Sequence, residues 1–374
     1  MKFDIERDDL AEALAVTSRV AGGRLSAQIA GGLLMRTNEA GLQLVATDQD
    51  LTVRTTLDMA AQPSDAIQVA GRVLHDVVRS MPPGRLTLET SGMGLTLTNG
   101  QSRIELTAAA SDSYPEPAPV QGPSFAVDAS DFRDALRQVL RSASSDPSRA
   151  IFTGVQLKLM AGGKLELVTT DTYRLSVRTC TTEKPVDGVA SFEGGEADIV
   201  VPARLLSELQ RVLTGKHSTV GIGFDERSID ISYGPTWYHS PRLMGSFPEW
   251  RKLLPPSYDY RLVVNRQAIL DSLRRVRAMD KDSNQSVRIG ISGNSVTIES
   301  TRSEIGAVED QLESAVAGES PSLLFTPQYL AEGIEAAEGE MVTIEFLDST
   351  KPALITGDDP EQFRYLVMPI KSPV

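Results

Sequence analysis

Hydrophobic and polar positions alternate along two stretches of this chain that have nearly the same sequence. Residues 167–179 read LVTTDTYRLSVRT, and residues 44–55 read LVATDQDLTVRT. Alternation with many Thr and Val side chains is typical of a β-strand with one buried face. An internal repeat is the simplest explanation for the recurrence.

The two copies differ in length by one position. Asp48 and Asp171 lie 123 residues apart, whereas Arg54 and Arg178 lie 124 residues apart. The separation grows by one residue between the aspartates and the arginines. We therefore expect the second copy to carry one inserted residue within 172–174. An inserted residue in a strand or its turn would redirect the side chains around it.

The same order of elements recurs three times. An alternating strand followed by an amphipathic helix begins at Lys2, Phe125 and Tyr260. The repeated strand phrase comes next, in a degraded form in the third copy. A second strand–helix unit then begins at Ile67, Ile199 and Leu323, and further strands close each copy. This fixed order favours one repeated α+β unit over three unrelated domains of similar composition.

Proline and glycine clusters mark the connections between the copies, at 115–123 and 253–260. We therefore predict three tandem α+β domains at 1–121, 122–256 and 257–374. If each copy joins the next edge to edge, strands continue from one domain into its neighbour and the helices share one face. Pairing with a second chain about a two-fold axis would close the assembly and cover the free sheet edges.

Arginine side chains recur along the predicted helices at helical spacing. Beside the apolar stripe Phe132, Leu136 and Leu140 runs a basic stripe, Arg133, Arg137 and Arg141. Basic residues on the other helices are Arg72, Arg79, Arg204, Arg211, Arg274 and Arg277. Each stripe taken singly is most simply a solvated face, but their recurrence suggests a basic inner surface that holds DNA without reading its bases. The last helix is an exception because it carries glutamates and no basic residue.

Composition narrows the class of protein. With 374 residues, 41% of them hydrophobic, the chain can bury two or three cores, and its net charge of −13 argues against simple electrostatic adhesion to nucleic acid. The acidic start argues against a signal peptide, and no apolar run is long enough to predict a membrane span. One cysteine, Cys180, fits a reducing cytoplasm. The three histidines lie far apart, so we expect no metal site.

Motifs of catalysis fail on inspection. TGKHS at 214–218 lacks the pattern of a phosphate-binding loop, and GISGN at 290–294 has the wrong spacing for a nucleophile elbow. We therefore expect a binding protein without a cofactor rather than an enzyme. Two other functions stay open at this point. One is a tandem-repeat scaffold that binds peptides without encircling DNA, and the other is a hydrolase built on repeats.

Several short motifs follow one another from one end of the chain to the other. They are MKF and ER at the start, GGR at 22–24, TDQDL, GRVLHDVVRSMPPG, SRIEL at 102–106, TDTYRL, FPEW followed by LLP, and YLVMPIK. In this order and over this length they resemble the bacterial DNA polymerase III β-subunit family of replicative sliding clamps. The resemblance implies three clamp domains per chain, with two helices inside and antiparallel sheets outside. It further implies a ring-shaped head-to-tail homodimer around duplex DNA, an ATP-driven clamp loader and a tethered replicative DNA polymerase.

In this family, partner proteins insert a short, apolar-ended linear motif between the second and third domains. The positions that match this pocket are Phe152, Thr170, Thr172, Tyr173, Arg174, Leu175, Pro248, Lys252, Leu253, Leu366, Val367, Met368, Pro369 and Ile370. A flexible methionine and aliphatic side chains suit a pocket that accepts several motifs. The simpler alternative is that YLVMPI is only a terminal edge strand.

The resemblance also implies DNA and dimer contacts. Besides the helical arginines, Arg24 and Arg149 would contact phosphates. The sheet edge of the first domain would meet the partner chain's third domain. The implied dimer-interface residues are Arg103, Ile104, Leu106, Ala278, Met279, Glu299 and Glu304.

Three positions depart from the family pattern. Lys371 and Lys252 stand where arginine is common, and Tyr173 stands where a histidine or another ring is frequent. These departures suggest a divergent second clamp whose altered pocket tolerates an inhibitor of the ordinary clamp. Such a copy would provide antibiotic resistance.

Overall fold

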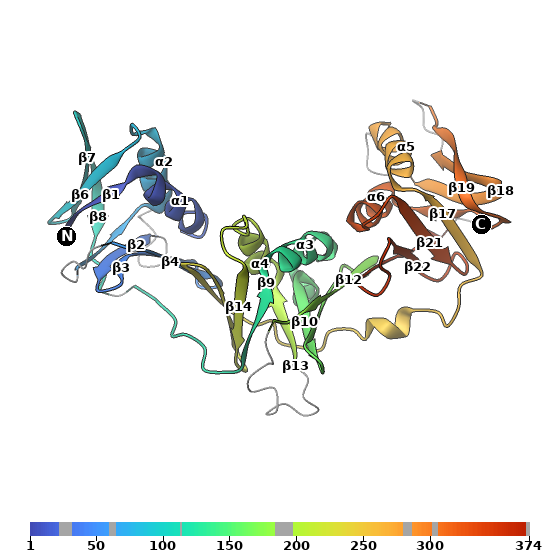
Figure 1. Cartoon of the computed structure of the whole chain (residues 1–374), viewed down its shortest axis with the longest axis horizontal. Coiled ribbons are helices and arrows are strands. Elements are labelled where there is room, and N and C mark those ends of the chain that lie inside the picture. The colour runs from blue at the N-terminus through green and yellow to red at the C-terminus, as the bar shows by residue number, and fades with distance from the viewer. Residues whose placement is uncertain are drawn as a thin grey trace. The chain divides into compact units, whose positions relative to one another are not determined.

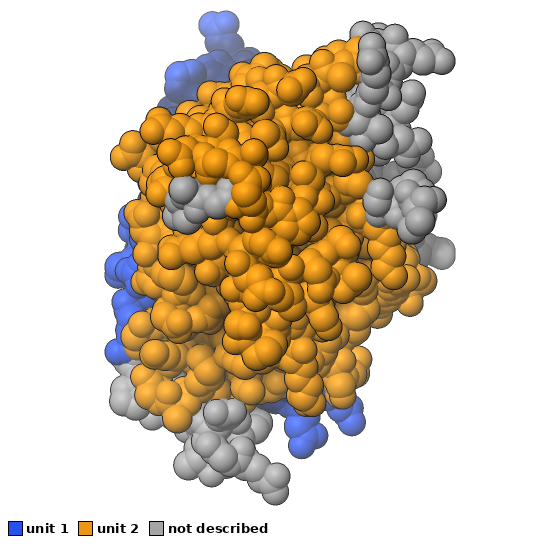
Figure 2. All heavy atoms as spheres, turned by 90° about the vertical axis from the view of Figure 1, so that its right-hand side faces the viewer, with its two compact units in different colours: residues 1–130, 183–191, 204–242 blue, residues 131–182, 192–203, 243–374 orange. Residues whose placement is uncertain are grey.

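The computed structural model describes residues 1–21, 32–59, 65–112, 114–183, 197–279, 286–300 and 306–371, the side chains of 316–318 excepted. The chain packs as two compact units, which Figure 2 distinguishes by colour. Unit 1 is Met1–Ser130, Glu183–Ser191 and Arg204–Arg242. Unit 2 is Asp131–Thr182, Phe192–Ala203 and Leu243–Val374. Each terminal repeat therefore packs with one part of the central repeat.

Unit 1 is built on one antiparallel sheet with the strand order β1-β6-β7-β8-β5-β2-β3-β4-β16-β15-β14-β9 over the described residues. Its strands are β1 (Lys2–Glu6), β2 (Leu33–Asn38), β3 (Gly41–Thr47), β4 (Thr52–Leu57), β5 (Asp65–Val69), β6 (Arg85–Ser91), β7 (Gly94–Asn99), β8 (Ser102–Ala109), β9 (Ser124–Asp128), β14 (Thr219–Phe224), β15 (Ser228–Tyr233) and β16 (Thr236–Pro241). Its helices are α1 (Arg7–Thr17), α2 (Gly71–Ser80) and α4 (Ala203–Gln210).

Unit 2 has the strand order β13-β10-β11-β12-β23-β22-β21-β17-β19-β18-β20 in the part of the chain that is described. Its strands are β10 (Gly154–Met160), β11 (Lys164–Thr170), β12 (Arg174–Thr181), β13 (Ala197–Pro202), β17 (Tyr260–Asn265), β18 (Val287–Ser300), β19 (Glu309–Glu319), β20 (Leu323–Phe325), β21 (Met341–Phe346), β22 (Ala353–Thr356) and β23 (Phe363–Val367). Its helices are α3 (Ala129–Val139), α5 (Arg266–Ala278) and α6 (Pro327–Ala336), with 3-10 turns η1 (Leu140–Ser142), η2 (Pro147–Thr153) and η5 (Trp250–Leu253).

Amphipathic helices pack in pairs against these sheets. In Figure 1, α1 lies beside α2 in the first repeat, and α5 lies beside α6 in the third. On α1 the buried residues Leu10, Ala13, Leu14 and Thr17 recur every three or four positions, which places them on one face of the helix. Gly71 begins α2, where a Cβ atom would meet the Cβ of Ala21 at 2.8 Å, so only glycine allows this close approach.

Strands of neighbouring repeats pair directly. In unit 1, β4 of the first repeat pairs with β16 of the second, with Thr55 opposite Thr236. In unit 2, β12 of the second repeat pairs with β23 of the third, with Leu175 opposite Leu366. The prediction that strands continue from one repeat into the next is therefore confirmed. This pairing explains why the central repeat contributes to both units.

Candidate functional site

The predicted insertion in the second copy of the repeated phrase is wrong. The last paired positions are Thr47 with Thr52 and Thr170 with Leu175, so each pair encloses a turn of four residues, 48–51 and 171–174, the latter including the first residue of β12. In both turns the second residue has a positive φ, +81° at Gln49 and +80° at Thr172. The two phrases therefore correspond at a constant separation of 123 residues, and Arg178 corresponds to Thr55 instead of Arg54.

Matching the two identical VRT segments gives a register that is wrong by one residue. Because neighbouring strand positions face opposite sides of a sheet, this wrongly places the two arginines on equivalent faces. Arg54 stacks over the Trp237 ring, with its guanidinium carbon 4.4 Å from the ring centroid. Arg178 is buried and donates to Gln138 of α3. The two arginines thus lie on opposite faces of their sheets.

Aspartate side chains hold both turns by the same hydrogen bonds. The Asp48 Oδ1 accepts from the Leu51 amide at 2.9 Å, and the Asp171 Oδ1 accepts from the Arg174 amide at 3.0 Å. An aspartate that accepts from the amides two and three residues ahead stabilises a tight turn. In both turns, the residue with the positive φ is the one directly after the aspartate.

Arg174 fixes the second turn to the third repeat. Its side chain is 9% exposed and pairs with Asp171 at 2.9 Å and with Glu332 of α6. Its guanidinium carbon also lies 4.3 Å from the centroid of the Tyr329 ring. Because a buried arginine needs anionic and hydrogen-bonding partners, these contacts hold the backbone of 171–174 against α6.

A cavity of about 280 Å³ opens beside this turn. The turn, η5, the 350–352 loop and the end of β23 surround it. Its lining residues are Thr170, Thr172, Tyr173, Arg174, Leu175, Lys252, Leu253, Thr350, Lys351, Pro352, Leu366 and Met368. Leu175 and Leu366 belong to a buried apolar cluster that also contains Phe247 and Trp250, so the lining rests on a packed core.

A second cavity of about 390 Å³ shares Tyr173 and Met368 with the first. It is lined by Tyr173, Thr326, Tyr329, Met368, Pro369, Ile370 and Lys371. The rings of Tyr173 and Tyr329 stack with centroids 6.5 Å apart. The Met368 amide donates to the Tyr173 carbonyl at 2.9 Å, so the chain after β23 is held in place along both cavities.

Exposed apolar side chains gather at these two cavities. Tyr173 is 59% exposed, Leu253 51%, Ile370 38% and Met368 37%. They are four of the seven large hydrophobic side chains that are exposed in the described part of the chain. Apolar side chains that stay in water around a preformed cavity are typical of a docking site for a partner segment.

Most of the predicted pocket positions lie together here, with three exceptions. Phe152, Pro248 and Val367 line neither cavity. Phe152 packs edge-on against Phe247 at 6.4 Å, and Val367 is fully buried. The sequence prediction missed Thr350, Lys351, Pro352 and Tyr329, because the loop and the helix that carry them show no pattern linking them to the turn.

Most of the predicted DNA-binding arginines in the described part of the chain are exposed, but most are paired with acids. Arg137 pairs with Asp134 and Glu338, and Arg141 pairs with Glu335 at 2.5 Å. Arg133, Arg204, Arg211 and Arg274 pair with Asp134, Asp48, Glu208 and Asp271, respectively.

Of the predicted DNA-binding arginines on helices, three make no ion pair with any described residue, namely Arg72, Arg79 and Arg277. Arg149 donates to the Thr172 hydroxyl at 3.2 Å, beside the candidate pocket. Arg24 lies outside the described residues.

The predicted dimer residues lie at a sheet edge and near a helix end. From Ser102 to Thr107, β8 pairs with β7 on one side and has no strand partner on the other among the described residues. Arg103 on this edge pairs with Glu105 at 2.7 Å. Ala278 and Met279 lie at the end of α5, and the exposed Glu299 lies near the end of β18. Glu304 lies outside the described residues.

The described ranges contain no cluster of three or more His, Cys, Asp or Glu side chains that could hold a metal ion. None of their helices is both long and apolar enough to cross a membrane.

Comparison with known proteins assigns the whole length of the chain. Family models for the DNA polymerase III β subunit match its N-terminal domain at 1–118, its central domain at 126–249 and its C-terminal domain at 251–371. The chain is 27% identical to the β sliding clamp of Streptomyces coelicolor and 23% identical to that of Bacillus subtilis. These alignments cover 99% of both chains in the first case and 100% in the second.

Solved structures agree with these matches. The sliding clamp of Bartonella birtlesii bound to griselimycin superposes with a TM-score of 0.91 at 25% identity, over 100% of both chains. The DNA polymerase sliding clamp of Bacillus subtilis superposes equally well, with a TM-score of 0.91 at 20% identity over the full length of both chains. The latter likeness shows a shared fold of three tandem domains.

Proposed function

This chain belongs to the DNA polymerase III β-subunit family and has the function of a DNA sliding clamp, and from this premise we propose how its surfaces carry out that function. Two copies close head to tail into a ring around duplex DNA. The ring tethers the replicative polymerase and other partners through linear motifs, and a clamp loader opens it. The protein itself acts by binding rather than by catalysis, in the bacterial cytoplasm where chromosomal DNA is copied.

The cluster of four exposed apolar side chains around two connected cavities carries the partner-binding part of this proposal. A short extended segment that ends in apolar residues would cover Tyr173, Leu253, Met368 and Ile370 and bury them on binding. Lys351 adds a positive charge at the rim without an ion-pair partner in the described residues, which suits a motif containing an acidic residue.

Fluorescence anisotropy with a labelled five-residue peptide that ends in Leu-Phe tests this site. We expect saturable binding that is lost when Leu253 and Met368 are both changed to serine. The matched control changes Met93 and Val73 to serine, because these are also exposed apolar side chains but lie in unit 1. Equal effects of the two double variants would remove the support for the pocket.

The ring part of the proposal is supported by the unpaired edge of β8. Small-angle X-ray scattering in line with size exclusion should give a mass near twice 40.4 kDa and the profile of a hollow ring. Changing Glu105 to proline removes an amide donor that points to the free edge, because the alternate amides of β8, such as that of Ala108, point to β7, and it should produce monomers. A monomer from the unaltered protein would instead favour the peptide-binding scaffold.

The proposed DNA binding is best tested at Arg72 and Arg79, which form no ion pair with any acid in the described residues. Changing Arg72 and Arg79 to glutamate should weaken retention on nicked circular DNA, and added salt should weaken the unaltered protein's retention in the same way. Changing Arg137 is a poorer test because its side chain already pairs with Asp134 and Glu338. The domain limits 1–121, 122–256 and 257–374 remain predictions that limited proteolysis can check.

The pocket departures support a further part of the proposal, that this is a divergent clamp with an altered inhibitor response. Griselimycin is bound in the solved Bartonella birtlesii clamp. We propose that this chain binds griselimycin more weakly than an ordinary clamp does, because Tyr173, Lys252 and Lys371 alter the surface. Calorimetric titration of both proteins decides the point, and equal affinities would contradict it.

A further inference from the structure

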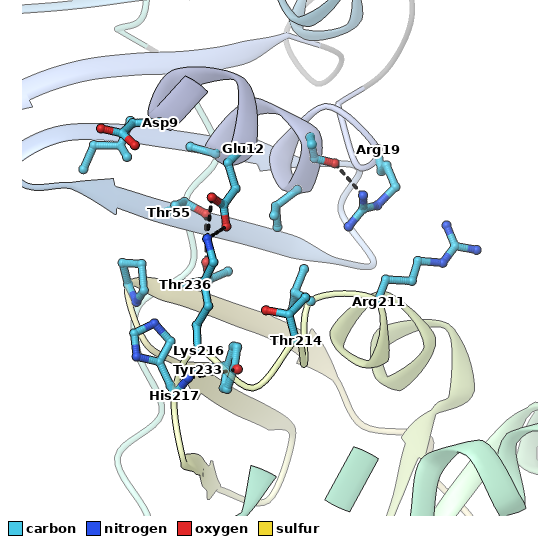
Figure 3. A pocket seen from close by; sticks show the side chains of 16 residues that line it. Asp9, Glu12, Arg19, Thr55, Arg211, Thr214, Lys216, His217, Tyr233 and Thr236 are labelled. Carbon is cyan, nitrogen blue, oxygen red and sulfur yellow. Dashed lines mark hydrogen bonds and ion pairs between the residues drawn. The ribbon is translucent and has the colours of Figure 1, made fainter. Parts of the chain in front are cut away.

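Unit 1 contains a cavity of about 400 Å³ that shares no lining residue with the candidate pocket. It lies between one face of α1, strands β4 and β16, and the loop that follows α4 (Figure 3). Its walls include Ala13, Val16, Leu57, Pro235 and Tyr233. Its volume and largely apolar walls fall within the range of small-ligand sites.

The corresponding position in unit 2 is filled by the chain's own side chain. Arg178 is 3% exposed and lies under α3, where it donates to Gln138 at 2.7 Å and to Asp131 at 2.6 Å. Counted from the two turns of identical geometry, Arg178 corresponds to Thr55. Thr55 is much smaller and lines the cavity in unit 1.

The helices correspond in the same way. Asp131 and Gln138 are the third and tenth residues of α3, and Asp9 and Val16 are the third and tenth residues of α1. Unit 1 therefore keeps the aspartate but lacks both the arginine and the glutamine that accompany it in unit 2. Asp9 lines the cavity and makes no hydrogen bond or ion pair with any described residue.

A second replacement enlarges the same space. Phe363 lies opposite Arg178 in unit 2 and is 4% exposed, whereas Thr236 lies opposite Thr55 in unit 1. The two threonine hydroxyls lie 3.1 Å apart and bond only each other. At these two positions unit 1 therefore has two small threonines where unit 2 has an arginine and a phenylalanine.

Among the charged side chains around the cavity, Asp9 is an anion that has no ion-pair partner in the described residues. Lys216 reaches up to α1, as Figure 3 shows, and its Nζ contacts both carboxylate oxygens of Glu12 at 2.5 and 2.6 Å. Arg19 and Arg211 lie away from Asp9, and both pair with Glu208. Each of these positive side chains contacts an acid other than Asp9, so the Asp9 end of the cavity can attract a cation.

We propose that this cavity binds a guanidinium or amidinium group carried on an aromatic body, with Asp9 as the anionic partner. The ligand takes the place that Arg178 and Phe363 take in unit 2. Its ring lies against Thr55, Thr236 and the apolar walls, and its cationic group forms charge-assisted hydrogen bonds with the Asp9 carboxylate.

Benzamidine is a suitable probe because it joins a phenyl ring to an amidinium, and neutral benzamide is its close match in shape. Titration followed by ligand-detected NMR should show saturable binding of benzamidine. Benzamide should bind the unaltered protein at least tenfold more weakly, since it cannot pair with Asp9. Equal binding of the two compounds, or no binding of benzamidine, overturns the proposal without the need for any variant.

Three variants place the binding at this cavity. D9N should weaken benzamidine by about tenfold to a hundredfold, the value of a hydrogen bond to a charged group. D8N is the matched control, because Asp8 is adjacent but pairs with Arg7 at 2.9 Å, and it should leave the affinity unchanged. T55R supplies the arginine of unit 2 and should abolish binding, while a retained melting transition shows that it folds. An unchanged affinity in D9N contradicts the proposal.

A Phe-Arg dipeptide with blocked ends distinguishes a peptide ligand from a free small molecule. It carries the same two side chains as Phe363 and Arg178 in unit 2. If the dipeptide binds more tightly than benzamidine and D9N weakens it, the natural ligand is an arginine of a peptide segment. If only benzamidine binds in an Asp9-dependent way, the ligand is a free small molecule.

Discussion

The turns at 48–51 and 171–174 have the same backbone but different surroundings. Each has four residues, an aspartate that accepts from the fourth residue's amide, and a positive φ at the second position. The third residue is Asp50 in one and Tyr173 in the other, and the fourth is Leu51 or Arg174. The candidate pocket therefore arose by exchange of side chains on a fixed turn, without any insertion.

The ion pairs between neighbouring repeats are alike in one place and different in others. In unit 1 the helix α1 supplies the acid Glu12 and the loop after α4 supplies Lys216. In unit 2, Arg137 of α3 pairs with Glu338, and Arg141 of η1 pairs with Glu335 as Arg19 pairs with Glu208 in unit 1. One ion pair is therefore common to both contacts, and the others are specific to one unit.

The largest effect is expected when the fourth residue of the second turn is made like the first. R174L leaves the carboxylates of Asp171 and Glu332 without their buried cation, which should cost about 3–5 kcal/mol of unfolding free energy. Urea unfolding measures the loss. The double variant R174L/E332L should recover part of it, and a loss below 1 kcal/mol in R174L would show that this ion-pair network does not hold the turn.

The third residue of the turn should change binding instead of stability. Y173D copies Asp50 and removes a ring that is 59% exposed, so unfolding should change by less than about 0.5 kcal/mol. Affinity for the Leu-Phe peptide should fall about tenfold or more, as for other aromatic anchors. Anisotropy measures the affinity, and D50Y in the first turn is the control that should leave it unaltered.

Two corresponding tyrosines should respond in opposite ways to loss of the hydroxyl. The Tyr365 hydroxyl donates to the Tyr329 carbonyl at 2.8 Å, so Y365F should cost about 1 kcal/mol. The Tyr238 hydroxyl is buried and has no partner in the described residues, so Y238F should be neutral or stabilising. Thermal unfolding compares the two, and a larger loss in Y238F would contradict the assignment.

The same tyrosines predict a pH effect. Burial raises the pKa of both Tyr238 and Tyr365 above the ordinary value of about 10. Since the folded pKa exceeds the unfolded one, their stabilisation is complete below pH 10 and is lost as the pH rises beyond it. Each phenylalanine variant should therefore show a shallower loss of stability above about pH 10 than the unaltered protein shows.

The smallest effect concerns the second residue of each turn. Thr172 is β-branched at a φ of +80°, a conformation that disfavours such side chains, so T172G should stabilise by on the order of 0.5–1 kcal/mol. Q49G relieves less strain because glutamine is unbranched at Cβ, and its gain should be smaller. Equal gains in chemical unfolding would show that branching does not matter here.

Much of the candidate pocket was accessible to sequence reasoning because its parts carry local signals. The turn, the residues 251–255 that follow FPEW, and the YLVMPI segment are each contiguous, and each contributes lining residues where predicted. Tyr329 and the loop 350–352 were missed because their place in the lining depends on pairing of β12 with β23 and on packing of α6. These contacts join positions far apart in the chain, and no periodicity records them.

By itself the sequence determined the repeated order of strands and helices, the alternation of buried and exposed positions, and the family resemblance, since these depend on local spacing and composition. Only the tertiary structure decided the register of the second phrase, which put Arg178 inside and Arg54 outside. It alone paired most of the helical arginines with acids and left a cavity beside Thr55. The physical reason is that register, ion pairing and packing volume depend on which side chains meet, and distant strands bring those side chains together.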